Sequence, residues 1–83
     1  MIKQEPDKEI IEKIIFLFNK KKYLEALDLS DKIIGKYPNS ILINNISGVI
    51  HTELKNYTLA KNLFNKVVNL NPKYNDGFYN LAN

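Results

Sequence analysis

Residues 57–72 read YTLAKNLFNKVVNLNP, and residues 23–38 repeat their pattern 34 positions earlier as YLEALDLSDKIIGKYP. A tyrosine opens both stretches, an alanine follows three positions later, and a proline closes both. A fixed period of 34 residues with these landmarks is typical of helix-turn-helix units that stack into an array. The repeat therefore predicts an all-α fold, a solenoid of helix pairs.

Length and composition limit the function. The chain has 83 residues, of which 45% are hydrophobic and 25% charged, enough for one small core but not for a conventional enzyme domain. The absence of cysteine excludes disulfides, thiol catalysis and thiolate metal sites. The longest apolar run, residues 14–18, is far shorter than the roughly 20 residues that cross a bilayer, and the charged first 13 residues do not resemble a signal peptide. We expect a cytoplasmic protein that is not an enzyme and has no cofactor.

Hydrophobic periodicity and turn signals predict four helices, at about 6–19, 23–35, 40–54 and 57–70. Pro6 suits a first helical position, Gly35 a helix stop, and Asn39 or Ser40 a helix cap. A fifth helix is expected to open at Phe78 and to be cut short by the end of the chain. The side chains expected to face inward on the first, second and fourth helices are Ile10, Ile11, Ile14, Ile15, Leu17, Phe18, Tyr23, Ala26, Leu27, Ser30, Ile33, Ile34, Tyr57, Ala60, Phe64, Val67 and Val68.

Gly48 lies in the middle of the third predicted helix. An interior glycine costs about 1 kcal/mol relative to alanine, so it needs a structural reason. Close approach of a neighbouring helix is such a reason. Because Ala60 is also small, we expect Gly48 to face Ala60 where the third and fourth helices cross.

These landmarks resemble those of tetratricopeptide repeat proteins. The second unit, about residues 39–72, matches the family pattern at Gly48, Tyr57, Ala60, Phe64 and Pro72. The first unit, about residues 6–38, matches at the tyrosine, the alanine and the proline, and residues 73–83 resemble the start of a third unit. The resemblance implies a right-handed solenoid, with four full helices and a short fifth, over one domain. One expectation is that this domain is the N-terminal part of a longer protein.

The chain departs from the family pattern at four positions. In the second unit Asn44 replaces the usual aromatic residue and Ser47 the usual leucine. In the first unit Ser30 replaces the bulky aromatic residue and an isoleucine replaces the glycine. The register of the first helix is uncertain by one residue for this reason.

The resemblance also implies a function. Family members bind peptide segments of partner proteins on a concave surface formed by the first helix of each unit, so a scaffold role in protein–protein interaction is expected. Carried onto this chain, the partner-binding residues are Leu42, Asn45, Val49, Thr52, Glu53, Asp76, Tyr79, Asn80 and Asn83. No small-molecule substrate, metal or membrane is expected. Some family members bind the C-terminal carboxylate of a chaperone with polar side chains of their first helices, and this carboxylate clamp is absent here, because Ile46 stands at the corresponding side of the second unit.

Two alternatives remain. No acidic residue lies between Glu53 and Asp76, whereas Lys55, Lys61, Lys66 and Lys73 do, so this half of the chain has a basic surface that nucleic acid or anionic lipid can use. Because all twelve basic residues are lysine, and arginine is the better reader of phosphate, a protein partner is favoured over nucleic acid.

The second alternative is that the chain is a fragment. Two complete repeats fall below the three or so that such arrays need. On this hypothesis, the repeats precede a catalytic domain such as a glycosyltransferase or sulfotransferase in the natural protein, or the C-terminal edge of the chain associates with another copy.

His51 is the single histidine of the chain, so no second histidine completes a catalytic or metal site with it. A groove or packing role is expected for His51.

Overall fold

Four α-helices make up the part of the chain that the structure, a computed structural model, describes, namely residues 5–73. They are α1 (Lys8–Asn19), α2 (Tyr23–Lys36), α3 (Ile41–Glu53) and α4 (Tyr57–Leu70). Residues 5–73 contain no strand, and the all-helical prediction is confirmed for them. The fifth helix predicted from Phe78 lies outside the described residues.

The helix boundaries repeat with the period of the sequence. Both α2 and α4 have 14 residues, and they begin 34 positions apart, at Tyr23 and Tyr57. Helices α1 and α3 end 34 positions apart, at Asn19 and Glu53. With these bounds, each residue of α1 stands 34 positions before a residue of α3.

The two turns that lead into α2 and α4 have the same conformation. Lys21 and Lys55 lie at their centres with φ of 63° and 64°, in the left-handed region that non-glycine residues rarely adopt. Both turns close the preceding helix with the paired hydrogen bonds of a Schellman motif. These bonds run from the N–H groups of Lys21, Lys22, Lys55 and Asn56 to the carbonyls of Phe18, Leu17, Thr52 and His51, over 2.8 to 3.0 Å.

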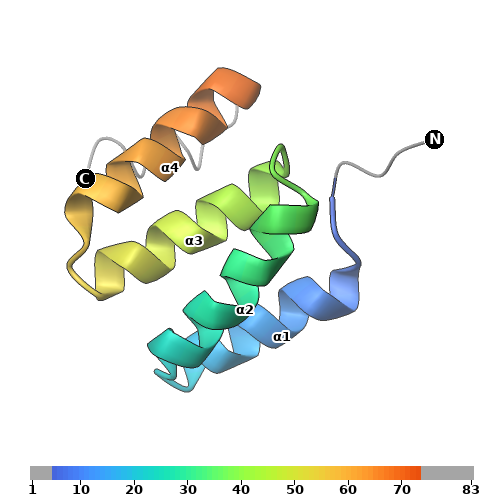
Figure 1. Cartoon of the computed structure of the whole chain (residues 1–83), viewed down its shortest axis with the longest axis vertical. Coiled ribbons are helices and arrows are strands. Elements are labelled where there is room, and N and C mark those ends of the chain that lie inside the picture. Colours follow the sequence, from blue (N-terminus) through green and yellow to red (C-terminus); the bar gives the residue numbers. More distant parts are fainter. Residues whose placement is uncertain (1–4, 74–83) are drawn as a thin grey trace.

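Each helix packs against the next one in the chain, and α1 also contacts α3 (Figure 1). Within residues 5–73, α2 does not contact α4, and α1 does not contact α4. Helix α3 is therefore the one that touches all the others. In Figure 1 α1 lies at the bottom of the molecule and α4 at the top.

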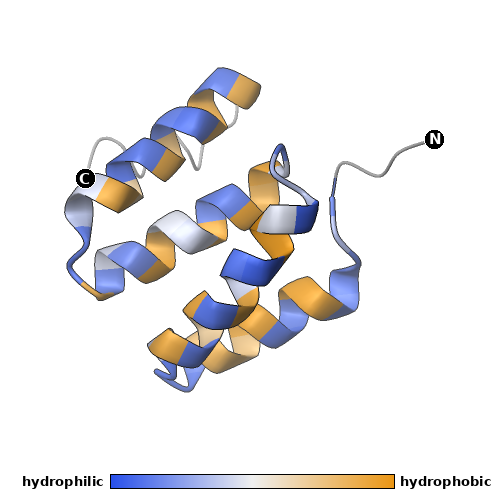
Figure 2. Ribbon diagram, in the orientation of Figure 1, coloured by the Kyte–Doolittle hydropathy of each residue, from blue (hydrophilic) through white to orange (hydrophobic). Residues whose placement is uncertain are grey.

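The core has two parts, both of which involve α3. Figure 2 shows α1 coloured mainly as hydrophobic and α4 as a mixture of hydrophobic and hydrophilic residues. Burying one isoleucine side chain contributes roughly 1.5–3 kcal/mol, so a few such residues account for the association of short helices. The first part joins α1, α2 and α3 through Ile11, Ile14, Ala26, Ile33, Ile43 and Ile50, and the second places Ala60, Phe64 and Val67 of α4 in the interior.

Two residues predicted to face inward are exposed. Ile15 is 42% exposed, because it follows the buried Ile14 by one position and therefore points about 100° away around the helix. Tyr57 is 61% exposed, although its counterpart Tyr23 is half-buried. Tyr23 packs against the ring of Phe18 with centroids 5.2 Å apart, whereas the counterpart of Phe18 is a threonine, which offers Tyr57 no ring.

The helix ends confirm one predicted detail and correct two. Ser40 caps α3, as predicted, by accepting a hydrogen bond from the N–H of Ile43 at 3.1 Å. Gly35, predicted to stop α2, lies inside it without a positive φ, and the helix ends one residue later. Pro6, predicted as the first helical residue, is buried and precedes the N-cap Asp7.

Candidate functional site

The predicted partner-binding residues of the second unit lie on α3. Leu42, Asn45, Val49 and Thr52 are spaced by three, four and three positions, which places them along one side of the helix. Leu42 is 41% exposed, Thr52 is exposed, and Asn45 and Val49 are half-buried. Glu53 is exposed at the end of the helix. These five residues form the candidate site, which is called the α3 face below.

The remaining predicted site residues, Asp76, Tyr79, Asn80 and Asn83, lie outside the described residues. The structure therefore brings together the five residues of the α3 face and leaves the predicted third-unit residues without a position.

The opposite side of α3 explains why the α3 face points outward. Five residues of the helix are buried, namely Ile43, Asn44, Ser47, Gly48 and Ile50. They alternate with the residues of the α3 face along the sequence, so burying one set leaves the other accessible. The helix is thus held by its inner side in contacts with α1, α2 and α4.

The closest of these contacts joins α3 to α4 at Gly48. A Cβ at this position would meet three atoms of the Phe64 ring first, two of them at 2.7 Å. The atoms nearest to this Cβ position thus belong to Phe64, because an aromatic ring is large enough to reach across the helix crossing and fill the space that glycine leaves. Ala60, which the sequence predicted to face Gly48, is buried on the same helix.

Two buried serines link α2 to α3. The hydroxyl oxygens of Ser30 and Ser47 lie 2.6 Å apart, and both residues are completely buried. Ser30 and Ser47 are two of the positions that depart from the tetratricopeptide pattern. Their departures compensate each other, since two polar groups that would be costly to bury alone satisfy one another.

The start of α3 is held by residues distant in sequence. The carboxylate of Glu5 accepts hydrogen bonds from the hydroxyl of Ser40 and, at 2.9 Å, from the N–H of Ile41, which lies 36 positions away. The amide of Asn44 donates to the carbonyls of Pro38 at 3.0 Å and Ser40 at 2.7 Å, while its own carbonyl oxygen is buried without a partner. A carboxylate at a helix N-terminus is favourable because free N–H groups and the helix dipole face it.

Ile15 is an exposed apolar residue that the sequence predicted to face inward. It stands 34 positions before Val49 and lies on α1, which contacts α3. The spacing pairs Ile15 with Val49, but the unsettled register of the first helix concealed this in the sequence.

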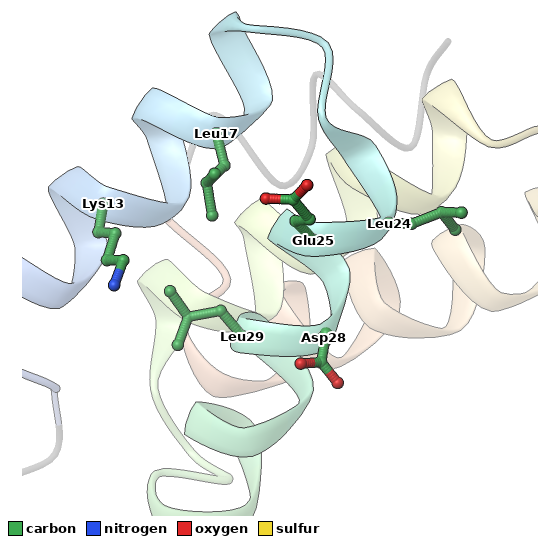
Figure 3. Close-up of a pocket in the computed structure, with 6 residues that line it drawn as sticks. All are labelled: Lys13, Leu17, Leu24, Glu25, Asp28 and Leu29. Atoms are coloured by element: carbon green, nitrogen blue, oxygen red, sulfur yellow. The ribbon is translucent and has the colours of Figure 1, made fainter.

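A pocket of about 440 Å³ opens between α1 and α2, and none of the residues that line it belongs to the α3 face (Figure 3). Figure 3 shows Lys13 and Leu17 projecting from α1, with Leu29 reaching toward them from α2. Glu25 completes the α2 side, with its carboxylate directed toward Leu17. The lining residues are Lys13, Leu17, Leu24, Glu25, Asp28 and Leu29.

His51 is the single histidine of the chain, and the structure shows its surroundings. His51 is half-buried, and its Nδ1 accepts a hydrogen bond from the Asn56 amide at 3.2 Å, next to the turn before α4. Within residues 5–73, no three histidine, cysteine, aspartate or glutamate side chains gather closely enough to hold a metal ion. In the same part of the chain no helix has the length and apolar character needed to span a membrane.

Comparison with known proteins gives no match: the chain fits no family model, and neither a curated protein nor a solved structure matches it.

Proposed function

We propose that the chain is a protein-interaction module of the tetratricopeptide type, whose α3 face, together with Ile15 of α1, binds an extended segment of a partner protein. The observation that carries the proposal is the row of accessible residues along α3, in which the apolar Leu42 and Val49 alternate with the polar Asn45 and Thr52. An extended peptide presents side chains and backbone amides in alternation, and such a surface accommodates both.

Three features support the solenoid arrangement on which this proposal rests. Helix boundaries recur at 34 residues, the two turns around Lys21 and Lys55 have the same geometry, and α1 contacts α3 while α2 and α4 stay apart. Helix pairs that stack in this way bring their first helices together along one surface. That surface is the one that carries Ile15 and Val49 at equivalent positions.

The chemistry of the face indicates the kind of segment bound. Leu42, Val49 and Ile15 favour apolar side chains, and the exposed carboxylate of Glu53 favours a lysine or arginine at the end of the segment. We therefore expect a segment with two or three apolar residues and a flanking basic residue.

A selection experiment tests the proposal. The 83-residue chain is immobilised and used to select binders from a random peptide library. Leu42→Ser is then compared with Leu59→Ser, a matched change on α4 where the leucine is 51% exposed. We expect Leu42→Ser to weaken the selected peptides by about tenfold, in line with the loss of one apolar anchor, and Leu59→Ser to leave them unchanged. Equal affinities for the two variants would contradict the proposal.

One observation favours a second candidate, the binding of single-stranded nucleic acid by α4. Tyr57 is exposed, and Lys61 follows it by one helical turn, so an aromatic ring and an ammonium group lie on the same side of the helix. Base stacking on such a ring, with a lysine near the phosphate, is a common mode of single-strand binding. Fluorescence anisotropy with a labelled RNA oligonucleotide at rising salt tests it: a steep loss of affinity with salt, abolished in Tyr57→Ser, supports this candidate, and the absence of binding at low salt eliminates it.

A further inference from the structure

The outer side of α1 corresponds to a surface that is completely buried one repeat later. Ser47 and Ile50 of α3 are both fully buried, the first hydrogen-bonded to Ser30 of α2 and the second part of the core shared by α1, α2 and α3. Their counterparts 34 positions earlier, Lys13 and Phe16, are exposed. The first helix thus presents to solvent the side on which its equivalent packs against a preceding helix.

This side is continuous with the pocket between α1 and α2. Phe16 is 59% exposed even though the Lys20 ammonium lies 5.6 Å from its ring centroid, and Leu24 is 73% exposed. Phe16 follows the pocket-lining Lys13 by three positions on α1, and Leu24 lines the pocket from α2. Exposed apolar side chains that lie on one surface mark an interaction site. We call the set formed by Lys13, Phe16, Leu17, Leu24, Glu25 and Leu29 the edge patch.

The charges of the edge patch are complementary to each other. Lys13 stands on the α1 wall of the pocket and Glu25 on the α2 wall (Figure 3). Neither forms an ion pair within residues 5–73, where the ion pairs are Lys8–Glu12 and Asp28–Lys32. A two-fold symmetric interface requires that a single surface be complementary to itself, with each residue of a pair meeting the other across the axis.

From these observations we infer that the edge patch is a homodimer interface, in which the pockets of two copies face each other. Phe16 and Leu24 fill the apolar centre, and Lys13 of each copy pairs with Glu25 of the other. A patch of one charge sign would repel a second copy of itself, whereas a patch that carries Lys13 and Glu25 pairs opposite charges across a two-fold axis. No residue of the α3 face belongs to the edge patch, so the dimer leaves the residues of the α3 face uninvolved.

Sedimentation equilibrium of the 83-residue chain, from about 10 µM to about 1 mM, tests the inference, because a patch of this size gives a weak dimer. We expect a monomer–dimer equilibrium. Lys13→Glu and Glu25→Lys should each raise the dissociation constant about tenfold, and the two changes together in one chain should restore it, since the patch is again complementary to itself. Leu24→Ser should abolish the dimer, and Leu59→Ser should leave it intact.

Thermal melts of the variants check that each is folded. All four changed positions are exposed, and the half-buried Leu17 and Leu29 are left unchanged. A chain that stays monomeric at about 1 mM overturns the inference. So does association that continues beyond the dimer, which is the result expected if α4 of one copy packs on α1 of the next. Failure of the charge exchange to restore the dimer overturns it as well.

Discussion

The ring of Phe64 occupies the space beside Gly48 that any larger residue at position 48 would need. Two ring atoms would lie 2.7 Å from a Cβ at this position, well inside van der Waals contact, and Phe64 itself is buried. Gly48→Ala should therefore lower the free energy of unfolding by about 1–3 kcal/mol through overpacking, despite the better helix propensity of alanine. A chemical denaturation curve measures the effect.

Gly35→Ala is the matched control for this prediction. Gly35 also lies in a helix, but a Cβ there meets nothing within 4 Å. The same substitution should therefore stabilise the protein by about 0.5–1 kcal/mol, since only the backbone entropy of the unfolded chain changes. If both substitutions shifted stability in the same direction, the close approach of α3 and α4 at Gly48 would be wrong.

The turns at Lys21 and Lys55 predict an unusual stabilisation by glycine. Both lysines have positive φ, which costs a residue with a Cβ about 1 kcal/mol and costs glycine almost nothing. Lys21→Gly and Lys55→Gly should each raise the melting temperature. Lys20→Gly, one residue earlier at a φ of −83°, should lower it. A lower melting temperature for either of the first two variants would rule out the left-handed conformation of that turn.

The hydrogen bond between Ser30 and Ser47 predicts non-additive mutations. Ser30→Ala removes one partner and leaves the other hydroxyl buried without one, at a cost of about 1–2 kcal/mol, and Ser47→Ala does the same. The double variant has no unsatisfied hydroxyl and should lose less stability than the sum of the two. A double-mutant cycle on the free energies of unfolding measures the difference, and strict additivity would show that the two serines do not interact.

The hydrogen bonds of the Glu5 carboxylate predict that Glu5, which precedes α1, stabilises the start of α3. Glu5→Ala removes the acceptor of the Ser40 hydroxyl and of the Ile41 N–H, and should cost about 1 kcal/mol. Hydrogen exchange at the start of α3 should accelerate in the same variant. Asp31→Ala, which removes an exposed carboxylate in the middle of α2, should change neither quantity. Equal effects of the two substitutions would argue against the link from Glu5 to α3.

Local patterns determined most of the fold. The period of 34 residues, the apolar spacing and the cap at Ser40 placed α4 at its observed bounds and the other helices within about two residues, because each signal acts on neighbouring positions. The exposure of Tyr57 could not be predicted from such local patterns. It depends on whether the preceding helix supplies an aromatic ring for the tyrosine to pack against, as Phe18 does for Tyr23, and therefore on a contact between two helices.

The candidate site was predictable only in part. The five residues of the α3 face follow from helical spacing once α3 is placed. The proposed correspondence of Ile15 with Val49 depends on the register of the first helix, which the sequence left open by one residue, and the helix ends at Asn19 and Glu53 favour a spacing of 34. The contact of Glu5 with Ser40 had no sequence signal, since the two are 35 positions apart and neither belongs to the repeat pattern. The partner of Gly48 was assigned to Ala60 because small residues suggested close approach, whereas a buried ring fills the space.

The most direct test of the proposed peptide-binding surface is a titration of the isotope-labelled chain with a selected peptide, followed by amide chemical shifts. The account predicts that the largest changes fall on the α3 face and on the equivalent position of α1, at Leu42, Val49 and Ile15, with α2 and α4 largely unaffected. Changes centred on α4 around Tyr57, or on the edge patch around Phe16 and Leu24, would contradict it.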